Sequence, residues 1–147
     1  MQPQIWIIGY LLANYNRFGE DALDVAREYF YELGKSMGQS IKRGMGIIET
    51  DANAVATVMN KALEEVWETK YAMKVKGNKI ISENTGFCPI EEGVRIMQGP
   101  WEIVCKNYSW QWFLGLAAGV NPNATMEVPE SRIWGNNCCF YKIEVPK

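Results

Sequence analysis

The spacing of the apolar residues in this chain changes once, near residue 69, and this change constrains the fold more than any other feature. Before residue 69, apolar residues recur every three or four positions, which is the period of an amphipathic helix. After it, apolar and polar residues mostly alternate, as they do in strands with one wet face, and one helical stretch interrupts the alternation. The chain therefore has a helical first half and a mainly stranded second half.

The first half predicts three helices. They cover about residues 4–18, ending at Gly19, then the stretch from near Asp21 to Gly44, and then a stretch that begins at Thr50-Asp51 and continues to Trp67. Threonine and aspartate are favoured residues at a helix start, and glycine is favoured just past a helix end. These signals separate the three helices without any long linker.

Two glycines stand inside the second predicted helix, at Gly34 and Gly38. A glycine in a helix interior costs about 1 kcal/mol relative to alanine, so a pair at a spacing of four needs a reason. We expect another backbone to pack closely against this face. A ligand in the same place is the alternative interpretation.

The second half predicts two hairpins around one helix. The expected order is a hairpin over 71–83 with its turn at Gly77-Asn78, a loop through 88–93, a helix over 99–118, and a hairpin over 125–145 with its turn at Gly135-Asn136. The sequence thus predicts an α+β fold: three N-terminal helices, then a β-hairpin, a helix and a β-hairpin. An antiparallel sheet of about four strands is expected to pack on the helices.

Length and charge narrow the class of protein. A chain of 147 residues that is 48% hydrophobic fits one domain over residues 1–147. The net charge of −2, without a basic stripe, predicts no nucleic-acid partner. The apolar run from Ile5 to Ala13 is too short to span a bilayer and lacks the basic start of a signal peptide. We therefore expect no membrane partner and a cytoplasmic protein, whose thiols stay reduced.

Four cysteines in a chain without histidine are the candidate chemical groups: Cys88, Cys105, Cys138 and Cys139. Neighbouring residues of a strand face opposite ways, so Cys138 and Cys139 cannot both enter one site. Cys139 shares a strand face with Ile143 and is expected in the core. This leaves Cys138 as the strand cysteine that could meet Cys88 and Cys105.

Three interpretations of these cysteines stay open. Cys88, Cys105 and Cys138, with a carboxylate or water, could hold zinc, although no C-x2-C pair is present. The same three thiols could be catalytic, with Cys88 in the best context beside Pro89. A carboxylate such as Glu91, Glu92 or Glu102 would then serve as the base in place of histidine. They could also be packing residues, or form a disulfide under oxidising conditions.

An aromatic group surrounds Cys105 on the fourth predicted helix. Trp101, Tyr108 and Trp112 fall near one helix face with this cysteine between them. The pattern predicts an aromatic pocket with a thiol on its wall, suited to a small planar or apolar ligand. The alternative is that these rings bury the helix on the sheet.

Scattered residues of the chain resemble one known pattern. They are Gly34 and Gly38, Cys88-Pro89, Cys105 inside a helix, Val120-Asn121-Pro122, and Gly135 followed by Cys138-x-Phe140. From about residue 21 onward, the chain resembles the L-2-amino-thiazoline-4-carboxylic acid hydrolase-like family. That family is related to 4-vinyl reductase domains and, more distantly in fold, to Bet3-type vesicle-tethering subunits.

The resemblance implies a ligand-binding α+β fold that is usually a homodimer through its helices. It also implies hydrolysis of a C–N or C–S bond in a small heterocycle or amide, such as the opening of a thiazoline ring. It marks Cys88, Cys105 and Cys138 as the family's cysteines and makes Asn121 an amide contact for substrate. The alternative is a non-catalytic small-ligand sensor or a zinc-binding module of the 4-vinyl reductase type. An interaction subunit that oligomerises through apolar helix faces is the third class.

Overall fold

The computed structural model describes residues 3–68 and 73–147. Its elements are α1 (Pro3–Phe18), α2 (Glu20–Gly44), α3 (Ala52–Trp67), β1 (Lys74–Lys76), β2 (Lys79–Asn84), α4 (Pro89–Met97), α5 (Trp101–Val104), the π turn η1 (Cys105–Ser109), α6 (Trp110–Val120), β3 (Thr125–Glu130), the 3-10 turn η2 (Arg132–Trp134) and β4 (Cys139–Glu144). The α+β class and the three N-terminal helices are confirmed. Tyr71 and Ala72, expected at the start of the first hairpin, lie outside the described residues.

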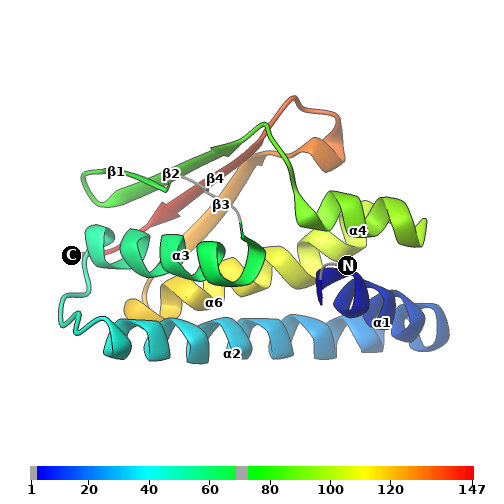
Figure 1. Cartoon of the computed structure of the whole chain (residues 1–147), viewed down its shortest axis with the longest axis horizontal. Coiled ribbons are helices and arrows are strands. Elements are labelled where there is room, and N and C mark those ends of the chain that lie inside the picture. The colour runs from blue at the N-terminus through cyan, green and yellow to red at the C-terminus, as the bar shows by residue number, and fades with distance from the viewer. Residues whose placement is uncertain (1–2, 69–72) are drawn as a thin grey trace.

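The four strands form one antiparallel sheet in the order β1-β2-β4-β3, so the two hairpins join where β2 pairs with β4. Figure 1 shows this sheet on one side of α3 and α6, with α2 on the far side of these two helices. The inner sheet face carries Ile80, Tyr141 and Ile143, which are all buried. Tyr141 packs edge-on against Phe113 of α6, with ring centroids 5.1 Å apart. The sheet therefore packs on helices as predicted.

Four glycines let α2 and α6 approach backbone to backbone. A Cβ at Gly34 would lie 2.4 Å from a carbonyl oxygen of α6, and one at Gly38 would lie 2.5 Å from another. On α6, a Cβ at Gly115 would lie 2.2 Å from a carbonyl oxygen of α2, and one at Gly119 would lie 2.5 Å from another. The close packing predicted from Gly34 and Gly38 is confirmed, and the facing helix occupies the place where a ligand was the alternative.

The prediction of a loop through 88–93 is wrong, because this stretch forms the start of helix α4. Pro89 occupies the first turn together with two glutamates, which are favourable features of a helix N-terminus. Gly93 suggests a break in the sequence, but a Cβ there would lie 2.4 Å from the Ile8 Cδ1 atom of α1. This glycine is a helix-packing residue.

The later elements also differ locally from their predicted forms. The helix expected over 99–118 is interrupted by η1, where the Trp110 backbone N–H donates to the Cys105 carbonyl. In the last hairpin, the register shifts between Glu127 and Glu130, and η2 follows before Gly135. The connection is thus longer than the two-residue turn that the sequence suggested.

Candidate functional site

The four cysteine side chains divide into an inner group and a surface thiol. Cys105 and Cys139 are buried and Cys88 is half-buried, and both Cys88 and Cys139 raise the pKa of Cys105 through like charge. Cys138 is half-buried, and its Sγ donates to a Glu130 carboxylate oxygen at 3.4 Å. The expectation that Cys138 meets Cys88 and Cys105 is therefore wrong, because Cys139 is the strand cysteine near Cys105.

The physical reason lies in which sheet face the helices cover. Strand alternation places Cys139 on the core face, where it is 7% exposed, and this part of the prediction is confirmed. The helix that carries Cys105 packs on the same face. Cys138 consequently points away from the other candidate thiols.

The two thiols with shifted pKa values are poor nucleophiles. Burial, followed by the charges of Cys88 and Cys139, raises the pKa of the Cys105 thiol far above its ordinary value. The hydrogen bond to Glu130, followed by desolvation and then by the charge of that carboxylate, raises the pKa of Cys138. Because the thiolate is the reactive form, both side chains are less reactive than an ordinary cysteine at neutral pH.

The metal interpretation has no support in the geometry. Over residues 3–68 and 73–147, no three His, Cys, Asp or Glu side chains are arranged to hold a metal ion. Cys138 would have to supply the third thiolate, and it lies on the opposite strand face from Cys139. A tetrahedral zinc site needs its ligands to converge on one point.

The aromatic residues around Cys105 fill the core. Trp112 stacks on Trp67 with ring centroids 5.3 Å apart, and Tyr108 packs on Phe30 at 4.6 Å. Burial raises the pKa of Tyr108 to about 12. Trp112 and Tyr108 therefore fit the alternative interpretation, in which their rings bury the helix. Trp101 is half-buried, and its Nε1 atom is shielded from solvent without a hydrogen-bond partner among the described residues.

Asn121 and Glu102 each have structural partners. The Asn121 side-chain amide donates to the Thr50 and Pro146 carbonyls at 3.0 and 3.3 Å, and its Oδ1 accepts from the backbone of Asn123. Both amide hydrogens are thus used in joining three chain segments, and the substrate contact of Asn121 stays a prediction. The pKa of Glu102 is lowered mainly by the hydrogen bond and charge of Lys106. Glu102 pairs with this lysine at the surface, and its role as a base also stays a prediction.

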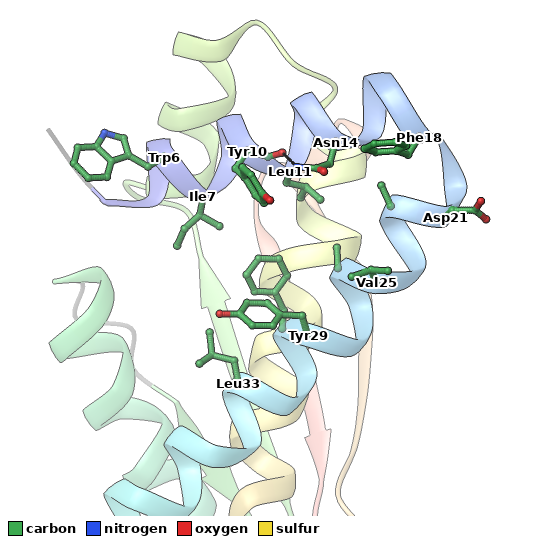
Figure 2. Close-up of a pocket in the computed structure, with 13 residues that line it drawn as sticks. Trp6, Ile7, Tyr10, Leu11, Asn14, Phe18, Asp21, Val25, Tyr29 and Leu33 are labelled. Carbon is green, nitrogen blue, oxygen red and sulfur yellow. Dashed lines mark hydrogen bonds between the residues drawn. The ribbon is translucent and has the colours of Figure 1, made fainter.

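A groove between α1 and α2 is the feature that the sequence interpretation missed. It has a volume of about 870 Å³, and Figure 2 shows side chains from both helices pointing into it. The buried side chains that line it are Leu11, Ala26 and Phe30. Its exposed lining residues are Trp6 and Tyr10, which are 75% and 76% exposed, and Phe18, Val25 and Tyr29.

The polar groups of this groove are few. Asp21 is the only charged residue among the described residues that line it, and the Asn14 side chain donates to the Tyr10 carbonyl at 2.8 Å.

A sequence signal for the groove existed in Val25 and Tyr29. Both are apolar or aromatic residues of α2 that stand off its buried stripe of Leu23, Ala26 and Phe30.

Comparison with known proteins leaves the family open. No protein-family model matches the chain, and no curated protein matches it. The resemblance to the thiazoline hydrolase-like family therefore stays a prediction. Within the described residues, no helix is both long and apolar enough to cross a bilayer.

Proposed function

We propose that this protein binds a small apolar molecule in the groove between α1 and α2, as a non-catalytic binding domain. The observation that carries the proposal is the groove itself, whose volume is about 870 Å³. Small-molecule sites typically enclose about 300–1,000 Å³, with apolar and aromatic walls and a few polar groups. The raised pKa values of Cys105 and Cys138 support a binding role over thiol catalysis.

The lining also indicates the kind of molecule. Buried Leu11, Ala26 and Phe30 offer an apolar surface, and transfer of ligand surface from water to such a site contributes about 25 cal/mol per Å². Among the described residues that line the groove, Asp21 carries a charge, and this charge is negative. An uncharged or cationic molecule therefore fits better than an anion.

The neutral dye N-phenyl-1-naphthylamine, whose fluorescence rises in apolar surroundings, tests this proposal. The wild-type protein should bind the dye, and Ala22→Phe, which fills the groove, should abolish binding. Val25→Ser should weaken binding by about fivefold, because it removes part of the apolar wall. Ile48→Ser is the matched control, since Ile48 is 84% exposed and does not line the groove. Equal dye affinity in Ala22→Phe and wild type would contradict the proposal.

A second copy of this chain could instead cover the same face. We place the interface of the homodimer that the resemblance implies on this face. The four exposed rings of the groove are 58–76% exposed. An aromatic side chain buries roughly 150–250 Å², so these rings alone present about 400–700 Å². A standard interface buries about 800 Å² per partner, so the rings supply half of it or more.

Hydrolysis of a C–N or C–S bond in a small heterocycle is our second proposed function. It is supported by Cys88, a half-buried thiol directly before α4, because a helix N-terminus favours a negative charge. The test is ring opening of 2-amino-thiazoline-4-carboxylate, followed by chromatography. Cys88→Ser should abolish turnover, whereas Cys138→Ser, at another half-buried cysteine, should retain it. Wild-type protein that opens no ring would rule this function out.

A further inference from the structure

A second, polar cleft lies where the start of α2 meets α5, η1 and the start of α6. Its volume is about 540 Å³. Leu23, Pro100 and Ile103 form apolar parts of its lining. Arg27 and Lys106 bring two cationic side chains, and Glu20 and Glu102 bring two carboxylates. The groove between α1 and α2 shares none of these residues.

The π turn explains why so many side chains of one segment reach this cleft. The lining residues of the segment are Glu102, Ile103, Lys106, Asn107, Trp110 and Gln111, which form two rows at a spacing of four. In an α-helix, each step of four residues rotates by about 40° beyond a full turn, so such rows drift off one face. A wider π turn at Cys105–Ser109 cancels part of this drift. Single π turns inside helices occur frequently at functional sites.

A buried amide fixes one cation at the cleft. Asn107 is only 4% exposed, and its side-chain nitrogen donates to the Ile103 carbonyl at 2.7 Å. Its Oδ1 accepts from the Arg27 guanidinium at 2.6 Å. The guanidinium of α2 is thereby held against η1, with further N–H groups left to donate.

One further donor at the cleft lacks an acceptor. The Trp110 Nε1 atom is shielded from solvent and has no hydrogen-bond partner among the described residues. Lys106 pairs with Glu102, and Arg27 pairs with Asp24, but both are exposed pairs within one helical segment. Such pairs are weak, so an incoming anion can replace either carboxylate. The cleft thus offers hydrogen-bond donors beside apolar walls.

We propose that this cleft binds the carboxylate of a small aromatic acid. The ligand carboxylate takes the place of Glu102 as partner of Lys106 and accepts from Arg27 and the Trp110 indole. The ring lies against the apolar lining formed by Leu23, Pro100 and Ile103. Nothing in the proposed function of the other groove requires this site.

Sodium benzoate is the probe, and side-chain ¹H–¹⁵N NMR spectra of the whole chain are the readout. Benzoate should shift the Trp110 indole signal, which Trp110→Phe identifies. Lys106→Met should weaken benzoate binding by about tenfold, because a charge-assisted hydrogen bond is lost. Lys61→Met is the matched control, since Lys61 also forms an exposed i,i+4 pair, with Glu65 at 3.3 Å. Glu102→Gln should strengthen binding, because it releases Lys106 and removes a like charge.

Two further arms keep the result specific. Benzamide has the same shape as benzoate without the charge and should not shift the Trp110 signal. Ala22→Phe, which blocks the other groove, should leave benzoate binding unchanged. The proposal is overturned if benzamide binds as well as benzoate, if Lys61→Met weakens binding as much as Lys106→Met, or if no indole signal moves.

Discussion

At the residue scale, the neighbours of each thiol set its reactivity. Cys138 donates to Glu130, and a nearby negative charge disfavours the thiolate, so the thiol pKa is raised. Glu130→Gln removes the charge and should lower this pKa, which increases the thiolate fraction at pH 8. We expect iodoacetamide to alkylate Cys138 about threefold faster in this variant, as measured by mass spectrometry of the peptide.

The control for this prediction lies on the same strand. Glu127 also belongs to β3, but it is not among the groups that shift the pKa of Cys138. Glu127→Gln should therefore leave the alkylation rate unchanged. An unchanged rate in Glu130→Gln would show that the hydrogen bond does not control this thiol.

How well the sequence predicts the surroundings of a single residue depends on whether neighbouring residues in the sequence determine them. Alternation along a strand is local, so it correctly separated Cys138 from Cys139 and put Cys139 in the core. Which sheet face meets the helix of Cys105 is a tertiary property, and this is where the expected thiol cluster failed. The hydrogen bonds of Asn121 were not predictable for the same reason, since its partners Thr50 and Pro146 are distant in sequence.

At the element scale, the glycine contact between α2 and α6 is the close helix packing that the sequence predicted. Gly38→Ala places a Cβ 2.5 Å from the Leu116 carbonyl oxygen, so the helices must move apart. We expect the free energy of unfolding to fall by about 1–3 kcal/mol, the usual cost of overpacking. Denaturant unfolding followed by circular dichroism measures this change.

Gly44 of the same helix supplies the comparison. A Cβ at Gly44 would meet nothing within 4 Å. Gly44→Ala should therefore leave stability unchanged or raise it by about 0.5–1 kcal/mol, because alanine loses less backbone entropy on folding. Equal losses of stability in the two variants would show that the close approach at Gly38 is not the cause.

Helices and strands were predictable where their apolar residues recur with a regular period. They were less predictable where a glycine could indicate either a helix end or a close helix contact. The three N-terminal helices and both hairpins follow from apolar spacing alone. Helix α4 was missed because Gly93 reads as a break in sequence, whereas its need for glycine comes from Ile8 on α1. The π turn η1 has no apolar period of its own and interrupts a helix that was otherwise expected.

At the scale of the whole molecule, the four exposed rings on α1 and α2 form an apolar part of the described surface. Periodicity identifies the face that a helix buries, but it does not tell what covers a second apolar face. Trp6 and Tyr29 lie on that second face and remain exposed in the single chain. Contiguous apolar patches of this kind mark binding surfaces, and the two proposed occupants make different demands on the assembly state.

Sedimentation equilibrium distinguishes these occupants. If a second copy covers the α1–α2 face, the wild-type chain should dimerise at micromolar concentration, and Tyr29→Glu should be monomeric, because a C2 interface buries each substituted residue twice. Ile48→Glu, at a still more exposed apolar position outside the groove, should still dimerise. Because ligand and partner would share one surface, saturating N-phenyl-1-naphthylamine should then shift the population toward monomer, by mass action. A chain that stays monomeric at high concentration and still binds the dye would assign the groove to the small molecule alone.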